Sequence, residues 1–279
     1  MTVEYVGAGA FASGTGALTV ALPAAATSGD LLLLAVESAN EAITAPSGWT
    51  ELGQVGTGTA AAAAAVRLGL FWRWYAAVSV TVADTGDHTT ARITAWRGCD
   101  PTGPISGSPA TRVDSSNTTT LTTPTVTVPA NGIAVHAVGI DRDAATTDTE
   151  LNAVTGATLV GSNTVTAGRG GGVGLLYSSA GQHTQASGFD TSLRHAYVSV
   201  ALAAAPDLLV GSGVVDYPTG ATSASFALTL PAPVSAGDWV LACVTSAASD
   251  LTSITTPTGA VTVLPLTSTP DGHLSGAVF

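Results

Sequence analysis

Residues 17–30, ALTVALPAAATSGD, return as residues 225–238, SFALTLPAPVSAGD, with Gly29 aligned on Gly237 at a shift of 208 positions. In both copies the Gly-Asp pair leads into an apolar run. A repeat of this kind fixes the architecture first, because each copy should fold into the same unit. The sequence therefore predicts one long unit followed by the beginning of a second.

The second copy has a longer loop and covers only the opening of the first. The turn Ile43–Gly48, ITAPSG, aligns with Ile254–Gly259, ITTPTG, at a shift of 211, so the loop before it gained three residues. Phe279 falls on Phe71, or within three residues of it. We expect the open strand edges of this incomplete second unit to be covered by a partner.

The composition favours many short strands. Of the 279 residues, 46% are hydrophobic and only 10% are charged, against about 25% charged in ordinary soluble domains. Frequent Val, Thr, Gly and Pro suit strands joined by tight turns. Leu31–Val36 and Ile133–Ile140 are apolar at every position or nearly so, which is typical of central strands buried on both faces.

Alternation along Val66–Trp74 places Trp72 and Trp74 with the core, and Arg67 and Arg73 towards solvent. Ten to twelve such strands in roughly 205 residues favour an all-β sandwich. We therefore predict a jelly-roll-like β-sandwich module over residues 1–205 and the start of a second, similar module over residues 206–279.

The net charge limits the classes of molecule that this protein is expected to bind. The net charge is −11 and every basic residue is Arg, which argues against a protein that tracks a nucleic-acid backbone or an anionic lipid surface. No signal peptide is visible at the N-terminus, and the longest apolar run is too short for a membrane helix. We expect synthesis in the cytoplasm, no membrane insertion and no nucleic-acid partner.

No motif predicts catalysis or a cofactor. The five histidines are scattered, GxSxG is missing, and Gly168–Gly172 lacks the spacing of a nucleotide-binding loop. Cys99 and Cys243 lie in different modules and belong to no CxxC pair, so neither a metal site nor a disulfide is indicated. We predict a protein that is not an enzyme.

One acidic loop is a weak calcium candidate. It carries Asp141, Asp143, Asp148 and Glu150, and closely spaced carboxylates can bind Ca²⁺ through oxygen. The spacing is not that of an EF-hand, and the glycine for its sharp turn is missing. A solvated hairpin tip is the favoured interpretation.

Trp49 and Trp96 are the candidate glycan-binding residues. Trp49 follows a turn and Trp96 ends a strand, so their rings are the ones expected at the surface for stacking on a sugar. The other three tryptophans fall on positions expected in the core.

Three short motifs resemble a known family: Gly29-Asp30, Pro46-Ser47-Gly48-Trp49 and Trp96-Arg97-Gly98. Together they are similar to a β-sandwich repeat of tail-associated structural proteins of bacteriophages, especially phages of actinobacterial hosts, and of some bacterial surface proteins. The resemblance covers most of residues 1–205 and fades in the second copy, where Ala260 replaces the tryptophan. It implies a structural role and carries no catalytic residues.

The resemblance leads to the functional expectations. The first is a virion protein, a minor tail, tail-tip or fibre-base component that binds copies of itself and neighbouring virion proteins, with strand addition at open edges as the route. The alternatives are a capsid decoration protein and a carbohydrate-binding module for host-surface glycans.

Overall fold

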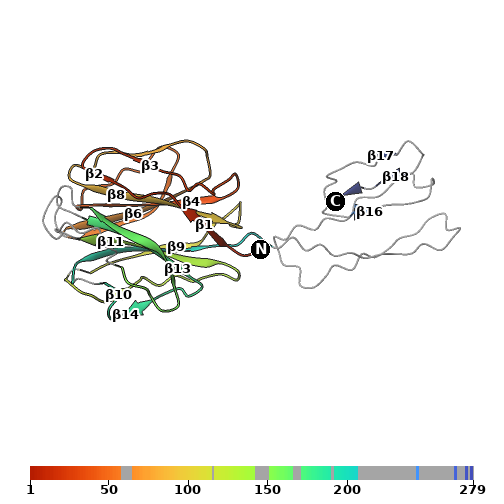
Figure 1. The fold of residues 1–279 in the computed structure, drawn as a ribbon. Coiled ribbons are helices and arrows are strands. Elements are labelled where there is room, and N and C mark those ends of the chain that lie inside the picture. Colours follow the sequence, from red (N-terminus) through yellow and green to blue (C-terminus); the bar gives the residue numbers. More distant parts are fainter. Residues whose placement is uncertain are drawn as a thin grey trace. The chain divides into compact units, whose positions relative to one another are not determined.

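The computed structural model describes residues 1–57, 65–114, 116–141, 151–165, 171–189 and 192–206, together with four residue pairs between 243 and 278. The chain divides into two compact units, Met1–Ala205 and Pro206–Phe279. Every regular element in the described residues is a strand (Figure 1). The prediction of an all-β fold is confirmed.

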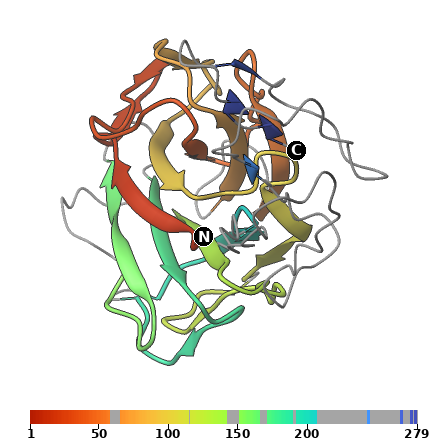
Figure 2. The same ribbon diagram turned by 90° about the vertical axis from the view of Figure 1, so that its right-hand side faces the viewer.

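Two antiparallel sheets form the first unit and lie face to face as two layers (Figures 1 and 2). The first sheet has the order β1 (Glu4–Ala8), β8 (Thr89–Arg97), β4 (Leu31–Ser38), β6 (Val66–Trp74), β5 (Thr50–Thr57), with β2 (Ala12–Gly14) also paired to β8. The second has the order β9 (Ile105–Val113), β15 (His195–Leu202), β11 (Ile133–Asp141), β13 (Gly171–Ser178), β12 (Thr158–Val165).

Four shorter strands form two-stranded ribbons. They are β3 (Leu18–Val20) with β7 (Val80–Val82), and β10 (Leu121–Thr122) with β14 (Thr184–Gln185). In the second unit, the described strands are β16 (Cys243–Val244) paired with β19 (Ala277–Val278), and β17 (Thr267–Ser268) paired with β18 (Leu274–Ser275).

The two large sheets have the same topology. Replacing β1, β4, β5, β6 and β8 by β9, β11, β12, β13 and β15 converts one strand order into the other, and the two ribbons correspond in the same way. The chain also finishes the first sheet before it begins the second. This order does not show the jelly-roll detail of the prediction, in which strands of both Greek keys would be shared between the sheets.

The hydrogen-bond registers of the two sheets also correspond. In each sheet the central strand makes eight pairs with its neighbour, and the irregular position on the edge strand falls just before a glycine. The central ladders run from Leu31↔Trp96 to Ser38↔Thr89 and from Ile133↔Leu202 to Ile140↔His195. The edge irregularities lie between Glu51 and Gly53 and between Leu159 and Gly161.

The first unit is therefore a duplication, and each copy, one sheet with its ribbon, is here called a sheet unit. The first sheet unit is residues 1–103 and the second residues 104–205. Ile133 takes the place of Leu31 only 102 positions later, about half of the 208-position shift. The 208-position shift that the sequence indicated therefore spans two sheet units, and the internal duplication within residues 1–205 is the feature that the sequence did not indicate.

The inner faces of the two sheets cover each other. The largest apolar cluster contains alternate residues of strands from both sheets, and nearly all of them are completely buried. Its strand members are Leu31, Leu33, Ala35, Val66, Leu68, Leu70 and Trp96 from the first sheet, and Val135, Ala137, Val173, Leu175, Ala196, Val198, Val200 and Leu202 from the second. Burial of this apolar area is the main stabilising term of the sandwich.

The outer face of each sheet is covered by its own ribbon and loops. Leu32, Leu34 and Val36 of β4 pack under the β3–β7 ribbon, and Ile140 of β11 packs against Leu121 of β10. All eight residues of β4 are buried. The prediction that Leu31–Val36 is a central strand buried on both faces is confirmed.

Each of the four edges of the sandwich contains an irregular strand, although the short β2, which shares an edge with β1, pairs regularly with β8. The pairings of β1, β5, β9 and β12 with their neighbours each contain a register shift. Bulges twist an edge and interrupt its row of free backbone groups, which discourages another strand from pairing there. These edges are poorly suited to the strand addition that the sequence led us to expect.

A substitution at Gly139 tests how closely the two sheets approach each other. A Cβ atom at this position would lie 3.1 Å from Val66 Cγ2 and 3.2 Å from Leu68 Cβ. Gly139→Val should therefore lower the free energy of unfolding by about 1–3 kcal/mol through overpacking. Denaturant unfolding measures the change. Thr81→Val, at an exposed position of β7, is the control and should shift stability by less than about 0.5 kcal/mol; equal effects would contradict the close approach.

Candidate functional site

The motifs Gly29-Asp30 and Trp96-Arg97-Gly98 meet in space. Arg97 donates two hydrogen bonds of 2.8 Å to the Asp30 carboxylate, from Nε to Oδ1 and from Nη2 to Oδ2. The backbone N–H of Thr27 donates a third, 2.8 Å from Oδ2. Asp30 is 1% exposed. This group of three residues, the Asp30 clamp, ties the beginning of β4 to the end of β8.

The electrostatics of the clamp favour the ionised carboxylate. Burial acts to raise the pKa of Asp30, but the hydrogen bonds from Arg97 and Thr27 outweigh it and hold that pKa below its ordinary value. Gly98 has φ 77° and lies against the carbonyl oxygen of Thr2, so a side chain would not fit there. The clamp is a structural device and offers no reactive group.

Asp30→Asn should lower the melting temperature at pH 7 by roughly 3–6 °C, since a charge-assisted pair is lost. Because the folded-state pKa of Asp30 is depressed, its contribution is complete above the ordinary pKa and disappears as the pH falls below about 4. The difference between wild type and variant should therefore shrink towards pH 2. Thermal melts across this range, with exposed Glu51→Gln as the control, measure it; a constant difference would contradict the assignment.

The structure buries both candidate glycan-binding tryptophans. Trp96 is fully buried, donates from Nε1 to Thr94 Oγ1 at 3.0 Å, and packs against Tyr5 and Tyr177 with ring centroids 5.3 and 5.2 Å away. Trp49 is 7% exposed in the outer-face core. The expectation that these rings lie at the surface is wrong. Trp96 falls on the side of β8 that faces the other sheet, and the turn before Trp49 places its ring in the apolar cluster on the outer face of the first sheet.

Among the four tryptophans that the structure describes, the two on β6 are the more exposed. Trp72 and Trp74 lie on the inner-face side as predicted, but both are only half-buried, with their rings edge to face 6.2 Å apart. Trp74 and Tyr75 line an apolar hollow of about 550 Å³ beside Cys99. Burial raises the pKa of the Cys99 thiol to about 12, which disfavours the thiolate form that acts as a nucleophile.

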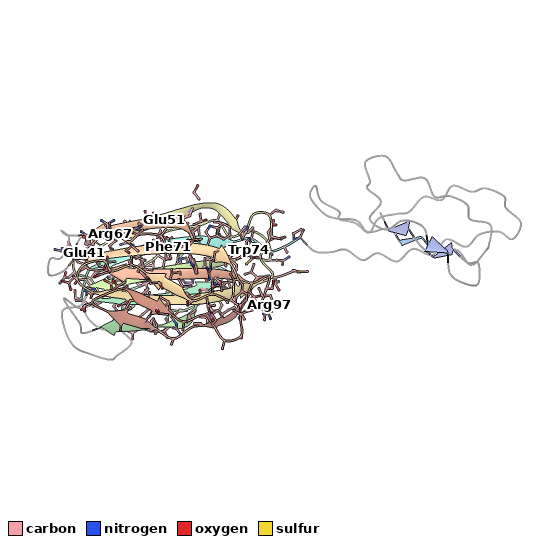
Figure 3. The ribbon with its side chains drawn as sticks, turned by 90° about the horizontal axis from the view of Figure 1, so that it is seen from above. Glu41, Glu51, Arg67, Phe71, Trp74 and Arg97 are labelled. Atoms are coloured by element: carbon pink, nitrogen blue, oxygen red, sulfur yellow. The ribbon has the colours of Figure 1, made fainter. Side chains whose placement is uncertain are left out.

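A buried acid–imidazole pair lies at the far end of β4 from Trp74, because Leu31 pairs with Trp74 whereas Glu37 pairs with Leu68, next to Arg67. Figure 3 labels Arg67 and Trp74 at opposite ends of the sandwich. His88 Nε2 is 3.1 Å from Glu37 Oε1, and neither side chain has any exposed surface. Asp87 lies 3.5 Å from the other ring nitrogen. Burial raises the pKa of Glu37 to about 7, and the carboxylates of Asp141 and Glu41 act in the same direction.

Glu37 should make stability depend on pH near neutrality. A carboxyl group with a raised pKa stabilises the fold while protonated, and the pKa of His88 is also raised, because Glu37 and Asp87 outweigh its burial. The wild-type melting temperature should therefore fall by several degrees as the pH rises from about 5 to 8. Glu37→Gln should flatten this decline, whereas Glu51→Gln should not. Parallel profiles for all three proteins would refute the role of Glu37.

The calcium candidates are only partly placed. Asp141 ends β11 and is 4% exposed, while Asp143, Asp148 and Glu150 lie outside the described residues. Among the residues that the structure does describe, no group of three His, Cys, Asp or Glu side chains could hold a metal ion. The calcium site stays a prediction, because three of its four residues are not described.

Two serine–histidine pairs occur in the second sheet unit. His136 Nδ1 is 2.7 Å from Ser199 Oγ, and His183 Nε2 is 2.6 Å from Ser178 Oγ. All four residues are buried, and burial lowers the pKa of His136 to about 4. In the described part of the chain no carboxylate hydrogen-bonds either ring, so the orienting acid of a catalytic triad is missing. These pairs satisfy polar groups inside the fold.

Sequence reasoning missed the Asp30 clamp and the Glu37–His88 pair, since their members are 67 and 51 positions apart. The motifs Gly29-Asp30 and Trp96-Arg97-Gly98 were the sequence feature that could have indicated the clamp.

The chain matches no protein-family model, no curated protein sequence and no solved structure. Within the described residues, no helix is long and apolar enough to cross a membrane.

Proposed function

We propose that this protein is a structural component of a bacteriophage particle, a minor tail, tail-tip or fibre-base protein. It works by assembling with copies of itself and with neighbouring virion proteins. It carries out no catalysis, and it needs no cofactor. Its position in the tail rests on the resemblance of its three motifs to tail-associated proteins.

The observation that carries the proposal is that the residues of the three motifs stabilise strands and turns. Asp30 and Arg97 lock two strands together, and Gly48 at φ 77° lets the turn bury Trp49. A motif set that only stabilises a sheet supports a building block rather than a binding or reactive site. The repetition of one sheet unit within the chain supports the same interpretation, because arrays of similar units are a common way to build extended assemblies.

The surface suits packing between proteins of low charge. Met1 and Val78 are the exposed large hydrophobic residues of the described surface, and charged residues make up only 10% of the chain. With bulges on all four sandwich edges, contacts in an assembly would use faces and ends of the sandwich instead of added strands.

Purified particles test the proposal directly. Mass spectrometry should find this chain in particles banded on a density gradient, and gold-labelled antibodies should mark the tail or its tip in micrographs. Labels on the head would replace the tail position by capsid decoration. Absence of the chain from purified particles, when it is present in the infected lysate, would overturn the structural role.

Deletion of residues 207–279 tests whether the second unit contributes to assembly. We expect the truncated chain to be depleted from particles by at least about tenfold, because it would lose one of its contact surfaces. Quantitative mass spectrometry of gradient-purified particles gives the ratio, and full-length Glu51→Gln is the control. Unchanged incorporation of the truncated chain would show that the second unit is not a docking element.

A further inference from the structure

The apolar hollow beside Trp74 lies at the end of the sandwich where β4 begins and where β6 and β8 end. Its volume is about 550 Å³, and the residues that line it, among them Ser28, Tyr75 and Pro101, belong to the first unit. Figure 3 labels Trp74 and Arg97 at this same end. A hollow of this size with a mainly apolar lining is typical of sites that hold small organic ligands.

The second sheet unit shows which residues at this end the fold itself requires. By the register of the two sheets, Trp72 corresponds to Tyr177, so an aromatic ring occupies this position in both units. Trp74 and Tyr75 correspond to residues 179–180, a serine and an alanine. A sheet of the same topology therefore forms without large rings at these two positions, and the needs of the fold do not account for Trp74 and Tyr75.

The Asp30 clamp at the rim of the hollow is also confined to the first sheet unit. Gly132 and Ala203 stand at the positions that correspond to Asp30 and Arg97. The clamp is joined to the aromatic pair by the backbone, since the N–H of Tyr75 donates to the carbonyl oxygen of Asp30 at 2.9 Å. The features that distinguish the first sheet unit from the second thus gather around one hollow.

Arg97 has hydrogen-bond donors to spare at this rim. Its Nε and Nη2 perform the structural role by binding Asp30 and Thr27, whereas Nη1 makes no hydrogen bond within the described residues. The side chain is half exposed, and the turn that holds it also supplies Ser28 and Gly29 to the hollow. Because the clamp already fixes the guanidinium, a ligand that accepts from Nη1 would restrict little further side-chain freedom.

The charges around the hollow favour a neutral ligand. Arg97 interacts with the carboxylates of Asp30 and Glu4, so its charge is already balanced. The net charge of −11 repels an anion, and the guanidinium at the rim disfavours a cation. A ligand that is apolar throughout would cover donors of Ser28 and Arg97 without offering them an acceptor.

We propose that the hollow binds a neutral oligosaccharide, which stacks on Trp74 and Tyr75 and accepts hydrogen bonds from Arg97. A sugar ring offers apolar C–H faces to aromatic rings and hydroxyl oxygens to a guanidinium, which is the combination of groups that this hollow presents. The site differs from the buried Trp49 and Trp96. Glycan binding would be a function in addition to assembly and does not depend on it.

Ligand-observed NMR on the full chain tests the proposal. The probes are neutral oligosaccharides of glucose, galactose, mannose and N-acetylglucosamine, each at about 1 mM, where dissociation constants in the millimolar range are detected. We expect saturation transfer from the protein to at least one of these sugars. Transfer to none of them would overturn the proposal.

Two exchanges of first-unit residues for their counterparts in the second unit locate the site. Trp74→Ser should weaken binding of the sugar by at least about tenfold, because the stacking ring is lost. Trp72→Tyr is the matched control on the same strand. It changes a half-buried ring that does not line the hollow, and it should leave the dissociation constant within about twofold.

A variant that fills the hollow separates loss of the site from loss of folding. Ser28 is exposed, so Ser28→Trp should occupy the hollow and weaken sugar binding by at least about tenfold while the melting temperature stays within a few degrees of wild type. Sugar binding that survives both Trp74→Ser and Ser28→Trp would place the ligand elsewhere and overturn the proposal.

Discussion

The pairing of two apolar inner faces is the constraint on which the rest of the first unit depends. A sheet whose central strand is apolar on both faces is stable only when both faces are covered. The ribbon of each sheet unit covers the outer face, and the other sheet unit covers the inner one. Neither half of the sandwich has an alternative cover for its inner face among the described residues.

The details of the sandwich follow from this pairing. Gly139 lets β11 approach β4 and β6, and Trp96 fills the seam between sheets together with Tyr5 and Tyr177. The Glu37–His88 pair is buried at the end of the same interface, where Gly171 leaves room for it. Close packing of this kind also explains why the polar chemistry of the chain is enclosed and not presented to solvent.

Much of the fold could be predicted from the sequence, but the size of the repeat could not. The apolar run Leu31–Val36 predicted a central strand, and the alignment of Gly29 with Gly237 indicated a repeat. The second sheet unit escaped notice because Gly132 takes the place of Asp30 and Ala203 that of Arg97, so the clamp is lost while the register persists. The same backbone pairing and burial form the sheet in both sheet units, whereas the Asp30–Arg97 clamp stabilises only the first.

The candidate site was less predictable than the fold. Burial of Trp49 depends on how a turn folds back under the sheet, and the Asp30–Arg97 contact joins distant segments, so neither can be read from local pattern. The sequence grouped Asp141 with the acidic residues that follow it in the chain. In the structure, Asp141 interacts electrostatically with Glu37 of the other sheet. Sequence spacing predicts neighbours along a strand and says little about neighbours across a sandwich.

Native-state hydrogen exchange tests the pairing of sheet units most directly. If the two inner faces stabilise each other, backbone amides in the middle of β4 and of β11, such as those of Leu33 and Val135, should exchange only through one shared opening of the whole first unit, with equal free energies and equal denaturant dependence. A first sheet that opens while the second keeps its protection, or the reverse, would show that each sheet unit folds alone and would contradict the account.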